Sequence, residues 1–249
     1  MNYKLTLMYE GTNYAGWQRQ NNAKTVQGEL ERALSVILRE PITTVGVSRT
    51  DAGVHAAGYT ANFHTTTALD VYKLCRGVNA LLEKDIRVTD AAPCPDAFSS
   101  RFDAHCKTYL YRIDTTPYGN PFYRRIAWHC PGALDVAAME RAAACFLGSH
   151  DFSAFMAQGG SAKTFTREIT ESSVSQTEGL VTYRITGNGF LYNMVRIITG
   201  TLVWVGRGKI KAADVPDIIA AKDRTRAGMT APAKGLTLLC ARYDNTIKE

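Results

Sequence analysis

The feature that most constrains the fold is the order in which two kinds of apolar spacing follow one another. Alternation of apolar and polar residues is typical of strands, whereas apolar residues three or four apart are typical of helices. The first part of the chain has the order strand, helix, strand, strand, helix, strand, which is the order of a ferredoxin-like unit. The segments that we assign are residues 3–9, 25–38, 43–47, 59–64, 74–82 and 86–88.

Individual residues support these assignments. Thr25 can cap the first helix, and Pro41 ends it. Residues 92–96, Ala-Pro-Cys-Pro-Asp, break the pattern, so we place the boundary of a first subdomain at residue 95.

The rest of the chain repeats roughly the same order. We expect a strand at 107–113, a helix capped by Asp135, a hairpin of 168–176 and 180–186 around Glu178-Gly179, a helix at 191–205, a short helix with Pro216 in its first turn and a strand at 236–240. The prediction is therefore an α+β fold. Two ferredoxin-like (RRM-like) subdomains, residues 1–95 and 96–249, form one extended mixed sheet with helices on one face. The active-site cleft lies between them.

Composition narrows the classes of function. A net charge of +6 and a pI near 9.0 favour a polyanion such as nucleic acid as partner. There is no run of about 18 apolar residues, and the N-terminus enters a strand pattern directly, so we expect neither a membrane span nor a signal peptide. The six scattered cysteines indicate reduced thiols and a cytoplasmic protein. Neither metal-ligand spacing nor a nucleotide-binding motif occurs, so no metal and no cofactor are expected.

Three segments could carry chemistry. Asp51 follows a strand on a Gly-containing loop, where an aspartate is either a turn residue or a functional carboxylate. Arg196 lies in an apolar helix, so its guanidinium either reaches solvent or meets an anion. The loop at residues 10–20 holds aromatic, amide and cationic side chains, which either contact RNA or pack against the core.

The run Arg49-Thr50-Asp51-Ala52-Gly53-Val54-His55-Ala56 resembles the active-site loop of the TruA-type tRNA pseudouridine synthases. Further matches to that family span nearly the whole chain: YEGT (9–12), GWQRQ (16–20), TVQG (25–28), KTYLYR (107–112), GFLYNMVR (189–196) and TAPAKGL (230–236). The chain departs from the family at Ser48, where Gly is usual, and after Leu82, where Pro is common.

The resemblance implies roles for individual residues. Asp51 corresponds to the essential catalytic carboxylate. Arg196 corresponds to the arginine that pairs with it, and such a pair would keep Asp51 ionised and directed at the base. Tyr109 corresponds to the tyrosine that stacks on the target base and helps to remove the C5 proton, while Tyr111 on the same strand face is expected to serve packing.

The same resemblance implies RNA contacts around the catalytic residues. Arg49 corresponds to the arginine that displaces the target nucleotide from the stem, although contact with a phosphate alone is the simpler alternative. Gln18, Arg19 and His55 are further candidates for RNA contact.

The implied activity is the isomerisation of uridine to pseudouridine at positions 38–40 of the tRNA anticodon stem-loop, by a homodimer without a cofactor. Asp51 could add to C1′, add to C6 or assist formation of a glycal, and the sequence does not choose among these routes. Two alternatives remain open: a synthase with another RNA target, such as rRNA, and a non-catalytic RNA-binding module.

Overall fold

A computed structural model describes residues 1–160 and 162–243, and it confirms the predicted α+β class. The chain divides into two compact units. The first unit comprises Met1–His105 together with the C-terminal segment from Leu238, and the second unit comprises Cys106–Thr237. This division differs from the predicted one at residue 95, because residues 96–105 and the segment from Leu238 group with the first unit.

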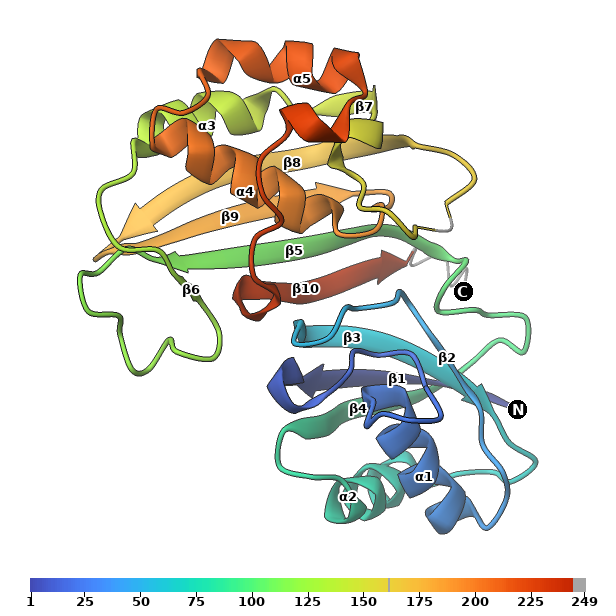
Figure 1. Cartoon of the computed structure of the whole chain (residues 1–249). Coiled ribbons are helices and arrows are strands. Elements are labelled where there is room, and N and C mark those ends of the chain that lie inside the picture. The colour runs from blue at the N-terminus through green and yellow to red at the C-terminus, as the bar shows by residue number, and fades with distance from the viewer. Residues whose placement is uncertain (161, 244–249) are drawn as a thin grey trace. The chain divides into compact units, whose positions relative to one another are not determined.

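The first unit has the predicted order of elements. They are β1 (Asn2–Tyr9), α1 (Val26–Leu38), β2 (Thr44–Gly46), β3 (His55–His64), α2 (Val71–Leu81) and β4 (Ile86–Cys94). Its strands follow the order β4-β1-β3, β2 pairs with β3, and all these pairs are antiparallel. Figure 1 shows α1 and α2 together on one face of this sheet. The loop between β2 and β3, which carries Asp51, therefore leads directly into β3.

Two local predictions for the first unit have different outcomes. The cap is confirmed, because the Thr25 hydroxyl accepts a hydrogen bond from the amide of Gly28 at 3.2 Å. The predicted break at residues 92–96 is wrong for its first part, because β4 continues to Cys94 and Pro93 pairs with Tyr3. β4 stands at the end of the strand order, and an edge strand tolerates proline because its outward amides need no partner.

The second unit is built from a hairpin-rich sheet covered by helices. Its elements are β5 (Ala104–Asp114), which starts at the end of the first unit, β6 (Trp128–His129), α3 (Val136–Ala144), β7 (Gly148–Asp151), β8 (Thr166–Thr177), β9 (Leu180–Gly187), α4 (Met194–Gly206) and α5 (Val215–Ala221). The strand order is β5-β9-β8-β7 with antiparallel neighbours, and β6 runs parallel to β5. Figure 1 shows α3 and α4 on the same face of this sheet. Sequence patterns did not indicate β6 or β7, which are too short to show a periodicity.

The predicted hairpin and the Asp135 cap of the second unit are confirmed. Glu178 and Gly179 have φ values of 48° and 80°, as a tight two-residue turn requires. Asp135 accepts a hydrogen bond from the amide of Ala138 at 2.8 Å at the start of α3. The helix predicted at residues 191–205 begins later, at Met194, because Asn193 before it has a left-handed φ of 60°.

The last strand, β10 (Leu236–Tyr243), belongs to both units, because its first two residues lie in the second unit and the others in the first. In the first unit it is the neighbour of β3. None of the described helices is long and apolar enough to cross a membrane.

Candidate active site

The loop that carries Asp51 is fixed by the residue before it. The backbone oxygen of Thr50 accepts a hydrogen bond from the amide of Trp17 at 3.1 Å, and its hydroxyl shares a hydrogen bond with the Tyr9 hydroxyl at 2.9 Å. The amide of Val54 donates to the backbone oxygen of Asp51 at 3.1 Å, which closes a turn. Thr50 is buried while Asp51 is half-buried, so the turn presents the carboxylate from a fixed backbone.

The segment at residues 11–17 packs against this turn and forms hydrogen bonds with it. Gly16 has a φ of +89°, and a Cβ there would overlap the backbone oxygen of Thr50. Trp17 is buried and stacks on Tyr59 with ring centroids 4.1 Å apart. Tyr14 is also buried, and its backbone oxygen accepts from the amide of Gly53 at 3.3 Å. These two aromatic side chains therefore follow the core-packing alternative.

Ser48 and His55 lie on either side of the turn. The φ of Ser48 is outside the left-handed region, so a serine fits where the family usually has glycine. Its backbone oxygen accepts a hydrogen bond from the Tyr59 hydroxyl. His55 is buried, and its Nδ1 accepts from the amide of Gly11 at 3.0 Å, which identifies Nδ1 as the unprotonated nitrogen. His55 thus fastens the 11–17 segment to the turn, and RNA contact by His55 stays a prediction.

Arg49 presents its side chain to solvent beside Asp51. It is exposed, and its guanidinium makes no hydrogen bond or ion pair with the other residues that the structure describes. An exposed cation at this position can contact a phosphate or occupy the space that a displaced nucleotide leaves.

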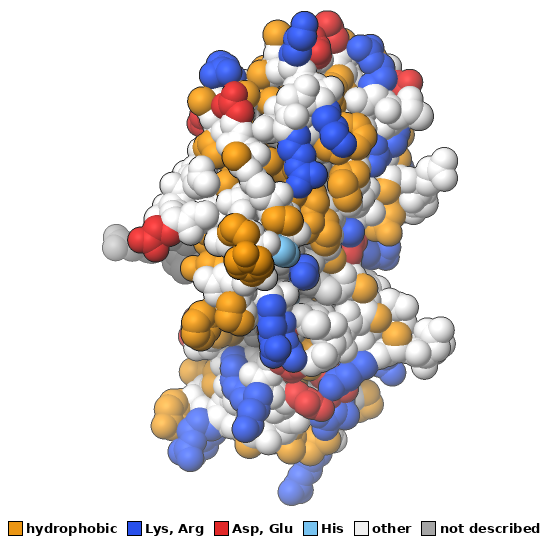
Figure 2. All heavy atoms as spheres, turned by 60° about the vertical axis from the view of Figure 1, so that its left-hand side comes forward, with side chains coloured by type: hydrophobic (Ala, Val, Ile, Leu, Met, Phe, Trp, Pro, Cys, Tyr) orange, Lys and Arg blue, Asp and Glu red, His pale blue; other side chains and the backbone are white. Residues whose placement is uncertain are grey.

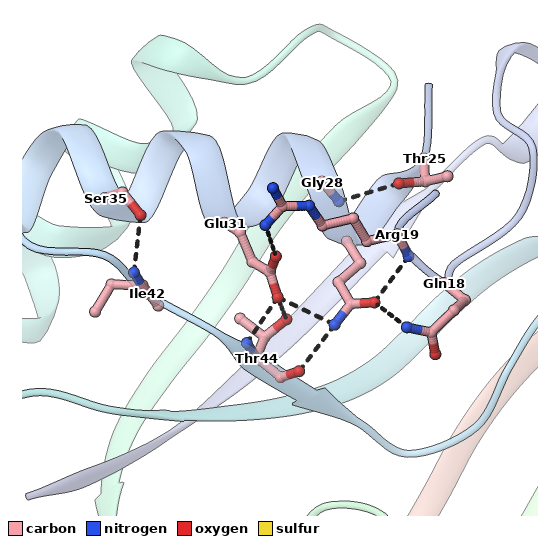
Figure 3. Close-up of polar contacts among 9 residues, drawn as sticks. Gln18, Arg19, Thr25, Gly28, Glu31, Ser35, Ile42 and Thr44 are labelled. Atoms are coloured by element: carbon pink, nitrogen blue, oxygen red, sulfur yellow. Dashed lines mark hydrogen bonds and ion pairs between the residues drawn. The ribbon is translucent and has the colours of Figure 1, made fainter. Parts of the chain in front are cut away.

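Gln18 and Arg19 are exposed, but buried partners on α1 set their positions (Figure 3). Gln27 accepts two hydrogen bonds at its Oε1, from the amide of Arg19 at 2.9 Å and from the Gln18 side chain at 3.1 Å. The Glu31 side chain is only 5% exposed, and it pairs with the Arg19 guanidinium at 3.3 Å. The chain direction after Trp17 is therefore fixed by α1.

Glu31 also ties α1 to β2 (Figure 3). Its Oε1 accepts from the amide and hydroxyl of Thr44, at 2.8 and 3.1 Å, and from Gln27 Nε2 at 3.0 Å. Sequence reasoning missed Gln27 and Glu31. The available signal was their spacing of one helical turn beside the buried face of α1.

Arg196 is fixed within the second unit by two acceptors. Its Nε donates to the backbone oxygen of Ala231 at 2.8 Å, and its Nη1 donates to Asn193 Oδ1 at 2.6 Å. The amide of Ala231 returns a hydrogen bond to the backbone oxygen of Arg196 at 3.1 Å. Because Arg196 is half-buried and its guanidinium is held at both Nε and Nη1, its direction is set by α4 and by the segment around Ala231.

Two tyrosines lie on one face of β5. Tyr109 is buried and meets Phe190 edge to face, with centroids 5.1 Å apart. Tyr111 is fully buried, and its hydroxyl donates to the backbone oxygen of Pro232 at 2.6 Å. Burial raises the pKa of Tyr111 above its ordinary value, and the nearby positive charge of Arg196 opposes that rise only in part. Tyr111 therefore stays protonated and serves packing.

The candidate residues divide between the two units. Asp51, Arg49, Gln18, Arg19 and His55 belong to the first unit, and Arg196 and Tyr109 belong to the second. The Asp51–Arg196 pair and the cleft between the units accordingly stay predictions. Within residues 1–160 and 162–243, no group of three or more His, Cys, Asp or Glu side chains is placed to hold a metal ion.

The surface charge is mostly positive on the face drawn in Figure 2, where Lys and Arg side chains are more widespread than acidic ones. This distribution agrees with the net charge of +6. A surface of this kind attracts the phosphate backbone of a nucleic acid without selecting a sequence.

Comparison with known proteins gives consistent matches. The sequence model of a family described as tRNA pseudouridine synthase matches residues 6–103 and 142–244. A protein of Acetivibrio thermocellus described as tRNA pseudouridine synthase A is 46% identical over 97% of this chain and 99% of its own length. Proteins of Ruminiclostridium cellulolyticum, with the same description, and of Clostridium tetani, described as tRNA pseudouridine synthase A 2, are 45% and 43% identical. These two matches cover 96% and 95% of this chain, and 98% and 96% of the relatives.

Proposed function

Since this chain belongs to the tRNA pseudouridine synthase family, we propose that it modifies uridines 38–40 of the anticodon stem-loop with Asp51 as its catalytic carboxylate. The enzyme is an isomerase that converts uridine to pseudouridine in tRNA. The observation that carries the proposal for Asp51 is the turn itself, in which backbone hydrogen bonds at Thr50 and Val54 hold a half-buried carboxylate next to an exposed arginine.

The reaction is an isomerisation and requires few catalytic groups. The N1–C1′ bond breaks, the uracil turns, a C5–C1′ bond forms, the C5 proton leaves and N1 ends protonated, so no atom is gained or lost overall. Asp51 can assist bond breaking by attack at C1′ or at C6, or by removing a proton on the way to a glycal. Each route requires the ionised carboxylate, and an arginine pair favours that form.

Arg196 and Tyr109 complete the proposed catalytic group. In this proposal Arg196 pairs with Asp51, and the hydrogen bonds to Ala231 and Asn193 support it because they limit the motion of the guanidinium. Tyr109 stacks on the extruded base and helps to take the C5 proton, with its ring braced by Phe190. A stacked base gains roughly 1–3 kcal/mol, which is comparable to the cost of leaving the stem.

The remaining candidates bind the RNA around the target nucleotide. Arg49 fills the space that the nucleotide leaves, while Gln18 and Arg19 contact the backbone from positions that Gln27 fixes. His55 contacts the RNA from its buried position beside the turn. We further propose that the enzyme is a cytoplasmic homodimer, as the family resemblance implies.

The test is tritium release from tRNA transcripts labelled at C5 of uridine, without added metal or cofactor. Wild type should release tritium, Asp51→Asn should release none while still binding tRNA, and the exposed Asp96→Asn should behave as wild type. Transcripts with cytidine at 38–40 should release no tritium. Turnover by Asp51→Asn would refute the catalytic role of that carboxylate, and release from transcripts lacking uridine at 38–40 would refute the target positions. A wild-type rate in Arg196→Ala would refute the ion pair.

A further inference from the structure

The segment between β5 and β6 presents two large aromatic side chains to solvent. Tyr118 is 98% exposed and Phe122 is 87% exposed, the highest fractions among the large hydrophobic side chains of the described residues. We call residues 115–127 the β5–β6 loop. Single exposed apolar residues are common, but two such rings on one loop indicate a contact surface.

Hydrogen bonds hold the β5–β6 loop in a defined conformation. Asp114 is buried, its Oδ1 accepts from the amide and hydroxyl of Thr116 at 3.0 and 2.6 Å, and its Oδ2 accepts from the amide of Asn120 at 2.6 Å. Asn120 Oδ1 accepts in turn from the amide of Phe122 at 2.9 Å. His129 Nε2 donates a hydrogen bond to the backbone oxygen of Thr116 at 2.9 Å. Because these bonds already order the loop, less conformational entropy is lost when its rings bind a partner.

The charge of the loop favours a polyanion. Residues 115–127 contain Arg124 and Arg125 and no acidic residue. Arg124 is exposed, and its guanidinium has no hydrogen bond or ion pair among the residues that the structure describes. Aromatic rings beside a cation suit RNA, because unpaired bases stack on the rings and phosphates meet the guanidinium.

The loop is connected to the segment that holds Arg196. Lys234 Nζ donates to the backbone oxygen of Arg124 at 3.4 Å, and Ala231, three residues earlier, accepts from Arg196 Nε at 2.8 Å. Figure 1 shows the long green segment after β5 at the same end of the second unit as the start of β10. RNA that reaches Arg196 therefore approaches the part of the unit from which the loop extends.

We propose that the β5–β6 loop is an accessory RNA-binding site, in which Tyr118 and Phe122 stack on unpaired bases of the tRNA and Arg124 contacts a neighbouring phosphate. The identity of the RNA rests on the proposed function, whereas the stacking does not depend on catalysis. Tyr118, Phe122 and Arg124 are outside the proposed catalytic group. The site therefore contributes to binding and leaves the chemical step unchanged.

The test is RNA affinity measured by fluorescence anisotropy with a full-length tRNA transcript and with a fully paired RNA duplex. The double variant Tyr118→Ala/Phe122→Ala should weaken tRNA binding at least ten-fold, since each stacked base contributes about a five- to hundred-fold factor. Binding of the duplex, which has no unstacked bases, should change less than two-fold, an order-of-magnitude expectation. KM for tRNA should rise by the same factor as Kd, with kcat unchanged.

The matched control is Tyr72→Ala. Tyr72 is 68% exposed on α2, with the Arg76 guanidinium 5.7 Å from its ring centroid. The Tyr72→Ala variant should leave tRNA affinity unchanged. Tyr118→Phe, which keeps the ring, should retain wild-type binding. These controls separate stacking from a general loss of exposed aromatic surface.

Two results would overturn the proposal. One is wild-type tRNA affinity in the double variant. The other is a change from dimer to monomer in light scattering that accompanies the lost affinity, which would assign the loop to contact between copies. If wild type releases no tritium, the proposed function fails, but the affinities still decide the role of the loop.

Discussion

Gly16→Ala tests whether the 11–17 segment sets the position of the catalytic turn. Gly16 lies on the first unit with a φ of +89°, a region that L-residues rarely adopt. A Cβ there would overlap the backbone oxygen of Thr50 and lie 3.1 Å from the carbonyl carbon of Asp51. Contacts of real Cβ atoms essentially never fall below 3.0 Å, so the turn must move away from the added methyl group.

The expected loss of stability follows from two contributions. The left-handed conformation costs a non-glycine residue about 1–2 kcal/mol. The withdrawal of Thr50 weakens the hydrogen bond from Trp17, which contributes about 1 kcal/mol. The free energy of unfolding should therefore fall by about 2–3 kcal/mol, out of about 5–15 kcal/mol for a typical domain. A displacement of roughly half an ångström at Asp51 should lower kcat by about ten- to hundred-fold, since about 1 Å can cost a hundred-fold.

Tritium release at saturating tRNA measures kcat, and urea denaturation measures stability. Gly208→Ala is the matched control, because Gly208 has a φ of +70° but no atom within 4 Å of its added Cβ. It should lose about 1–2 kcal/mol of stability and keep the wild-type kcat. A Gly16→Ala variant that is folded and turns over within two-fold of wild type would contradict the support role of the 11–17 segment.

Two further predictions concern buried carboxylates. Glu31→Ala should lower the free energy of unfolding by about 3–5 kcal/mol, because it leaves the donors of Thr44 without their acceptor, and Glu31→Gln, which keeps one accepting oxygen, should cost less in the same urea titration. Burial by itself would raise the pKa of Asp114, but hydrogen bonds from Thr116 and Asn120 outweigh it and hold that pKa below its ordinary value. The stability that Asp114 contributes is then complete above about pH 5 and is lost as the pH falls through the lowered pKa, so the difference between wild type and Asp114→Asn should shrink between about pH 5 and 2. A constant difference over that range would contradict the assignment.

Local patterns in the sequence predicted correctly those elements whose formation depends mainly on residues close by in the chain. The alternation of Tyr3, Leu5, Leu7 and Tyr9 predicted β1 correctly because one face of that strand is buried. The strand ending at Cys94 was cut short because proline is compatible with a strand only at an edge, and edge position depends on distant pairing.

The site shows the same limit. The motif around Asp51 identified the turn, whereas its supports come from Trp17, Tyr9 and Tyr14, which are distant in sequence. The polar spacing on α1 could have indicated a buried network, but its acceptor groups became clear only from the pairing of Glu31 with Thr44. The Asp51–Arg196 pair stays a prediction, because its two members belong to different units.

The division of β10 has a consequence for the order in which the protein can be completed during synthesis. Its later residues contribute to the first unit, where a Cβ on Gly58 would overlap the backbone oxygen of Leu239 and the Tyr243 hydroxyl donates to the backbone oxygen of Ser100 at 2.8 Å. These residues leave the ribosome after every residue of the second unit, Cys106–Thr237. The unit that is begun first is therefore finished last, and a nascent chain can complete its C-terminal half before its N-terminal half receives its final strand.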